Sequence, residues 1–267
     1  MIKILAIFTC FNRRELTKRS IETLAHNQDV KFDFVIVDDN STDGTKEMLA
    51  KLPQQIDLVS GDGSLFWNGG MHKAIEHVKK EHADYAYYML MNDDTRFFDG
   101  IFDEMAPFLK KDEVLVGAIC GEHGELSYGG IKYTKGIKYD KLGPEGAGVN
   151  CSTFNANCAI IPHEIFMRVG IDPYYKHSIG DFDYGLQISR LGYPIHIFPK
   201  YVGECNDNSL LLTWQDPSLP RIKRLRLKES RKGLPFDDWF HFLRRNFGLG
   251  TAIVRSFTPY IKILIKK

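Results

Sequence analysis

The chain has 267 residues, of which 43% are hydrophobic and 26% charged, and it carries a net charge of +1. This is an ordinary globular composition, long enough to bury a sizeable core without metals or disulfides. The five cysteines are an odd number without CxxC spacing, which argues against a disulfide framework or a structural zinc site. No signal peptide and no apolar run of about 20 residues is visible, so a cytoplasmic protein is expected.

The first half of the chain alternates short apolar runs with amphipathic stretches. A helix follows each of four predicted strands, which cover residues 4–8, 34–37, 56–59 and 85–91. At the first helix, Asn12 is predicted as the N-cap and Glu15 as its capping-box partner. The alternation predicts an α/β fold with a mostly parallel, doubly wound sheet flanked by helices. Ligands of such sheets bind outside the carboxyl ends of the strands.

Two acidic clusters stand at predicted strand ends. Asp38 and Asp39 follow the second strand, where a carboxylate can accept hydrogen bonds from a base or a ribose. Asn92, Asp93 and Asp94 follow the fourth strand, where a carboxylate can bind Mg²⁺ or Mn²⁺, which prefer oxygen ligands and bridge diphosphates. A solvated turn or a helix cap is the alternative at both places, because Asp is favoured in both.

The second half begins with hairpins and loops, predicted over residues 124–148, and continues with a strand-like run at 154–161. A helix is predicted to open at Gly180, with Asp181 and Asp183 in its first turn. One of these two carboxylates can act as general base toward an acceptor hydroxyl. The alternative is the favourable placement of acids at a helix N-terminus.

Several familiar catalytic patterns are absent from the sequence. It contains no HExxH, no GxGxxG or GxxxxGK[ST] phosphate loop, and no nucleophile elbow. The histidines show no paired metal spacing, and His72, His77 and His82 are interpreted as helix-surface residues.

The ordered series of motifs resembles family 2 glycosyltransferases with the GT-A fold. Residues 37–45 are close to the family's VDDxSxDGT run, and residues 7–13 are similar to its opening strand, which usually ends in an Asn-Arg pair. Residues 91–95 stand at the DxD element, often LNxD in rhamnosyltransferase-like members. Residues 154–158 resemble the acceptor-side NGN stretch, and residues 180–184 match the place of the ED motif. The resemblance runs from about Ile2 to about Ser209.

The resemblance implies roles for individual residues. Asp39, with Asp38 and Asp62, would hold the base and ribose, Asp94 would ligate the metal, and Asp181 would be the base of an inverting displacement. The full set implied for the nucleotide sugar is Thr9, Asn12, Arg13, Asp38, Asp39, Asp62, Trp67, Asn68, Gly69, Asn92 and Asp93. Asn155 and Asn157 would contact the acceptor.

Three positions depart from the family pattern. Asn92 replaces the usual first Asp of the DxD element, so metal binding would rest mainly on Asp94. Residues 201–206 lack the His that many members place after the last core strand. Gly180 stands where many members have Glu, which leaves Asp181 and Asp183 both open as the base.

The chain is predicted to comprise a catalytic domain at residues 1–220 and a basic helical tail at 221–267. A nucleotide-sugar half is expected at about 1–95 and an acceptor half at about 96–220. The tail has thirteen Lys/Arg and three Asp/Glu, a net of +10, against −9 for the rest. It either attaches to an anionic membrane surface or caps the acidic catalytic domain. Nucleic-acid binding is not expected, since no recognised module is present.

These observations predict a glycosyltransferase. It would use Mg²⁺ or Mn²⁺ to move a sugar from a nucleotide-diphosphate sugar to a hydroxyl of a glycan or lipid-linked acceptor, in cell-surface polysaccharide synthesis. A sugar nucleotidyltransferase is one alternative, but it should show a Gly-rich, basic loop after the first strand, which residues 9–12 are not. A non-catalytic nucleotide-sugar-binding protein is the other, but it need not keep Asp94 and Asp181.

Overall fold

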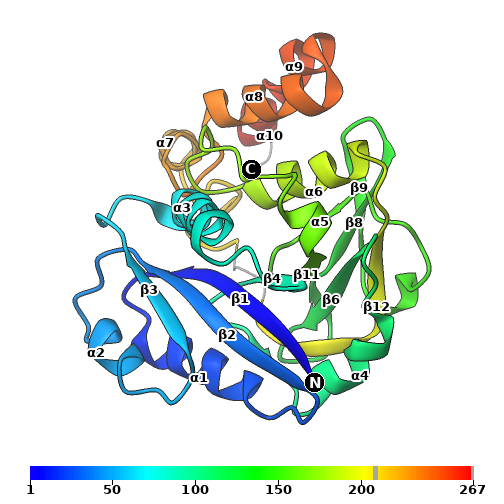
Figure 1. Ribbon diagram of the computed structural model, residues 1–267. Helices are drawn as coiled ribbons and strands as arrows, with labels where there is room; N and C mark the ends of the chain where they lie inside the picture. The colour runs from blue at the N-terminus through cyan, green and yellow to red at the C-terminus, as the bar shows by residue number, and fades with distance from the viewer. Residues whose placement is uncertain (207–209, 266–267) are drawn as a thin grey trace.

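The computed structural model describes residues 1–206 and 210–265. Ser209, where the family resemblance was expected to end, lies outside the described residues, as do Lys266 and Lys267 of the basic tail. The described chain is an α/β domain with a helical extension at its C-terminal end (Figure 1). No helix among the described residues is long and apolar enough to cross a membrane.

A nine-stranded sheet forms the centre of the domain, in the order β3-β2-β1-β4-β11-β6-β12-β5, with β7 paired to β6. Its strands are β1 (Ile2–Cys10), β2 (Val30–Asp38), β3 (Ile56–Ser60), β4 (Tyr87–Met91), β5 (Arg96–Phe97), β6 (Val114–Cys120), β7 (Leu126–Tyr128), β11 (Cys158–Pro162) and β12 (Ile195–Glu204). A second sheet, in the order β10-β8-β9, contains β8 (Gly130–Lys135), β9 (Lys138–Leu142) and β10 (Thr153–Phe154).

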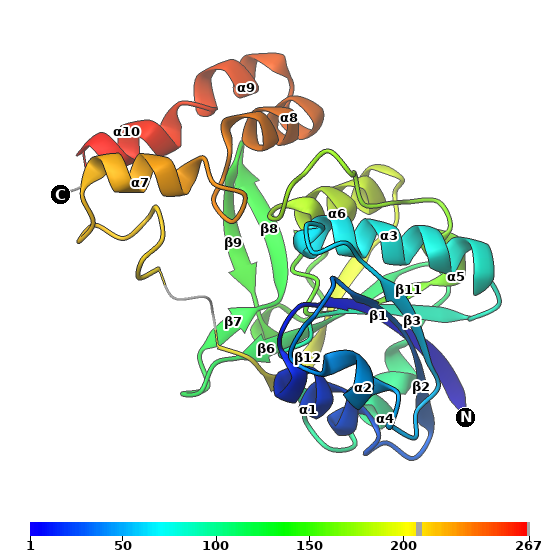
Figure 2. The ribbon, with the colours of Figure 1, turned by 90° about the vertical axis from the view of Figure 1, so that its left-hand side faces the viewer.

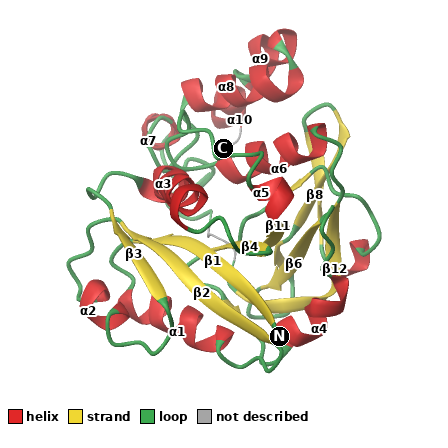
Figure 3. Cartoon of the chain, viewed as in Figure 1, coloured by secondary structure: helices red, strands yellow, loops and turns green. Residues whose placement is uncertain are grey.

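Helices cover both faces of the large sheet, and four more follow it (Figure 3). The first six are α1 (Arg14–Leu24), α2 (Thr45–Leu49), α3 (Phe66–Glu81), α4 (Ile101–Met105), α5 (His163–Phe166) and α6 (Gly180–Arg190). The extension contains α7 (Arg221–Lys228), α8 (Phe236–Phe247), α9 (Leu249–Arg255) and α10 (Thr258–Ile265). Two 3-10 turns, Ala106–Phe108 and Pro144–Gly146, complete the described elements.

The core is divided into two layers by the sheet. On one face α3, α5 and α6 bury apolar side chains against the strands, and on the other α1, α2 and α4 do the same (Figure 1). Strand β1 has Ile4–Phe8 buried without alternation, as expected for a strand covered on both faces. Helix α3 places Met71, Ile75 and Val78 on one face, which is the spacing of an amphipathic helix.

The predicted α/β fold is confirmed, but the sheet is parallel over only part of its width. Strands β3, β2, β1 and β4 are parallel neighbours, whereas β11 is antiparallel to both β4 and β6. The strand predicted at 154–161 is two strands, β10 and β11, interrupted at residues 155–157. A strand needs a crossover connection, usually a helix, to run parallel to its neighbour. Because β11 follows the small antiparallel sheet without an intervening helix, it runs antiparallel to β4.

The helical extension packs onto the α/β domain through α8. Phe242 and Leu243 of α8 are buried in a third apolar cluster with Tyr175, and Phe182 of α6 packs against it. In Figure 2, α7 lies beside α10, and α8 beside α9, at the end of the molecule beyond α6. Lys228 of α7 is fully buried, donates to the Tyr260 hydroxyl of α10 at 2.8 Å, and lies 4.0 Å from that ring centroid.

Candidate active site

The carboxyl ends of β1, β2, β3 and β4 meet at one edge of the sheet. Cys10 pairs with Asp38, Asp38 pairs with Ser60, and Ile7 pairs with Leu90. Residue 93 therefore stands about level with residue 10, since both lie three residues beyond the Ile7–Leu90 pair. The two acidic clusters predicted at strand ends are thus brought to the same edge, as expected for parallel strands.

Asp39 organises the loop between β3 and α3. Its side chain is only 4% exposed, and its two oxygens accept hydrogen bonds from the backbone N–H groups of Gly63, Leu65 and Phe66 at 2.8–3.1 Å. The carboxylate therefore caps the start of α3. Asp62 is exposed and accepts from the backbone and side chain of Ser64. The predicted contacts of Asp38, Asp39 and Asp62 with a nucleotide stay predictions.

The prediction that Asn12 is the N-cap of α1 is wrong. Asn12 has a φ of 51°, a left-handed conformation that Asn tolerates but that differs from the extended one of an N-cap. Its side-chain oxygen accepts from the backbone N–H of Thr42 at 2.7 Å. The N–H of Arg14, the first helical residue, is satisfied by Asp43 at 2.9 Å. The turns after β1 and β2 are therefore bonded to each other. Thr9, before this turn, donates to the Val37 carbonyl.

Asp93 and Asp94 share one cationic partner. One nitrogen of the Arg13 guanidinium lies 3.0 Å from Asp93 and 2.8 Å from Asp94. Asp93 is 6% exposed, and burial raises its pKa to about 6, although Arg13 acts to lower it. Asp94 is more open, and the thiol of Cys205 lies 3.5 Å from its other oxygen. Two carboxylates that converge on one cation are an oxygen donor set that suits Mg²⁺ or Mn²⁺.

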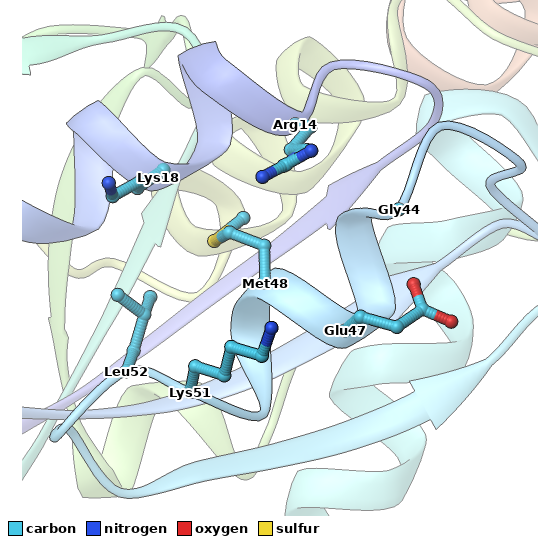
Figure 4. Close-up of a pocket in the computed structure, with 7 residues that line it drawn as sticks. All are labelled: Arg14, Lys18, Gly44, Glu47, Met48, Lys51 and Leu52. Carbon is cyan, nitrogen blue, oxygen red and sulfur yellow. The ribbon is translucent and has the colours of Figure 1, made fainter.

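Two hollows lie near α1, and only one includes a predicted site residue. The first, about 340 Å³, opens beside Asp94 and is bounded by Ser20, Arg96 and Cys205 among others. The second, about 420 Å³, lies between α1 and α2 and is bounded mainly by charged side chains (Figure 4). Asp94 therefore has open volume next to it.

The segment at the start of α3 contributes one half-buried side chain, Trp67, and one fully buried side chain, Asn68. The indole of Trp67 donates to the side-chain oxygen of Asn92 at 2.8 Å, which joins the α3 start to the strand end of β4. Asn68 is fully buried, and its amide donates to the carbonyls of Asp172 and Tyr175. The predicted contact of Asn68 with the nucleotide sugar stays a prediction, and in this structure the Asn68 side chain is in contact with Asp172, Tyr175 and Gly180. Gly69 is half-buried at the same turn.

Close packing fixes α3 against two other elements. A Cβ at Gly70 would lie 2.3 Å from the Thr9 hydroxyl, so α3 approaches β1 as closely as glycine permits. A Cβ at Gly180 would lie 1.8 Å from the side-chain oxygen of Asn68. That oxygen is buried and has no hydrogen-bond partner among the residues that the structure describes.

Asp181 lies against the break between β10 and β11. It is half-buried, and it accepts from the backbone N–H of Ala156 at 3.3 Å and of Phe182 at 2.9 Å. Burial raises the pKa of Asp181 to about 6, and these two bonds offset part of the effect. The predicted acceptor residues Asn155 and Asn157 flank Ala156. The side-chain oxygen of Asn155 and the side-chain nitrogen of Asn157 are buried, and neither has a hydrogen-bond partner among the described residues.

Asp183, the other predicted base, is buried in a different environment. It is 0% exposed and accepts from Gln187, from Asn246 at 2.8 Å and from Arg245 at 3.1 Å. Because its carboxylate is fully buried and bonded to α8, it has no room for an acceptor hydroxyl. This environment favours a structural role for Asp183 and Asp181 as the base, and the choice between the two stays a prediction.

The structure also brings three residues to the site that the sequence did not single out. His177 approaches the backbone N–H of Trp67, and its pKa is lowered by burial and then by nearby Lys232 and Arg13. Arg231 lies 5.4 Å from the Phe66 ring centroid. Only the basic character of the tail could have pointed to Arg231 and Lys232, and nothing local marks His177.

A family model described as "Glycosyl transferase family 2" matches residues 6–170. The chain belongs to this family, and its fold is GT-A. The mannosyltransferase PcManGT from Pyrobaculum calidifontis, in complex with GDP-Man and Mn²⁺, is similar with a TM-score of 0.58 at 13% identity, over 98% of this chain and 72% of that one. S. aureus TarS 1-349 is similar with a TM-score of 0.59 at 14% identity, over 98% and 90%. The same TarS fragment with UDP-GlcNAc gives 0.56 at 14%, over 99% and 80%. No curated protein matches the sequence significantly.

Proposed function

We propose that this protein transfers a sugar from a nucleoside diphosphate sugar to a hydroxyl group, with inversion at the anomeric carbon. The observation that carries the proposal is the pair Asp93 and Asp94. Both carboxylates bond to the Arg13 guanidinium at the carboxyl edge of a family 2 glycosyltransferase sheet. The Mn²⁺ and GDP-Man held by the similar mannosyltransferase support the same interpretation of this edge.

Different residues of this chain would act on the acceptor and on the leaving group. Asp181 takes the proton of the acceptor hydroxyl as its oxygen forms the new bond to the anomeric carbon. The bond from that carbon to the phosphate oxygen breaks, and its electron pair leaves with the nucleoside diphosphate. Asp94, with Asp93, would hold a divalent metal, which supplies Lewis-acid stabilisation of that leaving group. Arg13 adds fixed positive charge at the same edge.

A metal-dependence experiment tests the donor half of the proposal. Nucleoside diphosphate binding, measured by calorimetry across the common nucleotides, is expected to need Mg²⁺ or Mn²⁺ and to fall at least about tenfold when chelator is added. Asp94→Ala should weaken binding in the presence of metal to the level of the chelated protein. Equal affinity with and without chelator for every nucleotide would remove the metal from the mechanism.

The tail is proposed to place the enzyme at the inner face of an anionic membrane, where lipid-linked acceptors of cell-surface polysaccharide synthesis would be reached. Helices α9 and α10 and the turn between them expose apolar side chains that include Val254 at 68%, Phe257 at 54% and Ile261 at 50%. The same tail carries a net charge of +10, against −9 for the rest of the chain. Apolar residues among basic ones suit an interfacial helix rather than a span.

Deleting residues 221–267 is expected to weaken binding to anionic liposomes and to slow transfer to a lipid-linked acceptor more than to a soluble one. Because α8 also packs on the catalytic region, a milder variant separates the two roles. Val254→Ser with Phe257→Ser should lower liposome affinity about tenfold or more while the melting temperature changes little. Higher salt should weaken binding as well. If the intact protein does not bind anionic liposomes at low salt, the tail is only a structural cap on the α/β domain.

A further inference from the structure

A cluster of metal-ligating side chains lies away from the candidate active site. The side chain of Asp57 on β3 is met by two histidines, His77 within α3 and His82 just after it. One oxygen of Asp57 lies 2.6 Å from the Nε2 atom of His77 and 2.7 Å from that of His82. The three ligand atoms all lie within 4.8 Å of one another. His77 and His82 thus lie partly exposed at the surface of α3 and its end, and both bond to Asp57, which the sequence did not single out.

We propose that Asp57, His77 and His82 bind a borderline transition-metal ion, Zn²⁺ above all, at a site separate from the donor site. Two imidazole nitrogens and one carboxylate oxygen form a ligand set that zinc accepts and that Mg²⁺, which prefers oxygen alone, does not. Three protein ligands leave a fourth tetrahedral position for water. The side chains are 24–39% exposed, so solvent and the ion can reach them.

The observed distances fit such a centre after a small movement. Ligand atoms around tetrahedral zinc, with bonds of about 2.0–2.1 Å, lie about 3.3 Å apart. The Asp57–His77 and Asp57–His82 contacts need to open by less than about 1 Å to reach that spacing.

The cluster is distant from the donor edge. Asp57 lies three residues before Ser60, the last residue of β3, which amounts to about 10 Å along a strand. His77 lies eleven residues after Phe66, the first residue of α3, or about 16 Å along a helix. The ion would therefore not take part in sugar transfer. It would tie the C-terminal end of α3 to β3, which lies at the edge of the sheet and has β2 as its neighbour.

Zinc titration of the full-length chain tests the proposal. We expect one Zn²⁺ per chain by calorimetry, a higher melting temperature with Zn²⁺, and a Co²⁺ derivative with the intense visible absorption of a tetrahedral site. Asp57→Asn and His77→Gln should each weaken Zn²⁺ binding more than about 100-fold, beyond the 10–100-fold typical of changes in the outer shell. Circular dichroism without metal checks that both variants fold.

Two control variants show whether zinc binding is specific to this cluster. His72→Gln removes a histidine of the same helix that bonds to the Ile171 carbonyl, and Asp94→Ala removes the proposed donor-site ligand. Both should keep wild-type Zn²⁺ affinity and the cobalt spectrum. The proposal is overturned if the wild-type chain binds no Zn²⁺, if its Co²⁺ spectrum is that of weak octahedral binding, or if Asp57→Asn binds Zn²⁺ as well as the wild type.

Discussion

Replacing Asp181 with asparagine is expected to lower kcat by about 10²–10⁴-fold while the affinity for the nucleotide sugar stays nearly unchanged. Asparagine keeps the size of the side chain, and its single oxygen can still accept one of the two hydrogen bonds from the Ala156 and Phe182 N–H groups. It cannot take a proton from the acceptor hydroxyl. Steady-state turnover together with calorimetric donor binding measures the two effects separately.

The matched control is Asp183→Asn, two residues along the same helix. Because Asp183 is fully buried against α8, this change should lower the melting temperature and leave the turnover of the folded fraction near normal. The assignment of the base is refuted if Asp181→Asn keeps near-normal turnover while Asp183→Asn abolishes it.

The pH dependence gives a second signature of the same base. A general base works in its ionised form, and burial raises the pKa of Asp181 to about 6. Turnover should therefore fall about tenfold per unit below that pH and level off above it. The pKa of Asp93 is raised to a similar value, so the profile should be recorded for Asp93→Asn too. The fall of turnover at low pH that we assign to Asp181 should remain in the Asp93→Asn variant.

Replacing Arg245 with methionine is expected to lower the free energy of unfolding by about 3 kcal/mol. Arg245 bonds to Asp183 at 3.1 Å and lies 3.4 Å from Asp172, so its loss leaves a fully buried carboxylate without its cation. The expected size is at the lower end for a broken ion pair because Arg245 itself is 38% exposed and because Gln187 and Asn246 still donate to Asp183. Urea unfolding at neutral pH measures it.

Arg244→Met is the comparison for that experiment, since Arg244 is also exposed on the same helix but does not bond to Asp183. It should change stability by less than about 0.5 kcal/mol. Adding Asp183→Asn to Arg245→Met should recover part of the lost stability, because the uncompensated charge is then gone. Equal effects of Arg244→Met and Arg245→Met would show that α8 is not held by this ion pair.

The sequence was sufficient for strands β1 to β4 and for the acidic ends of two of them. Buried parallel strands appear as continuous apolar runs, and a polar residue directly after such a run has to lie at the sheet edge. The direction of β11 was not accessible in this way, because an apolar run carries no information on which way the chain returns. The parallel sheet was therefore expected to be wider than it is.

Contacts between distant segments explain the individual errors. The partner of Asn12 is Thr42, thirty residues away, so a local capping pattern could not identify it. Asp181 and Asp183 look alike in sequence, and only the packing of α8 distinguishes them. His77 and His82 have no metal spacing on their own, because the third member of the cluster comes from another strand.

Positions 68 and 180 constrain each other. A Cβ at position 180 would lie 1.8 Å from the side-chain oxygen of Asn68, so any larger residue there requires Asn68 to move. Shortening Asn68 would open the space but would remove the two hydrogen bonds that hold the 172–175 segment. Each single change is therefore expected to cost stability, and the glycine at 180 and the asparagine at 68 form one packed unit.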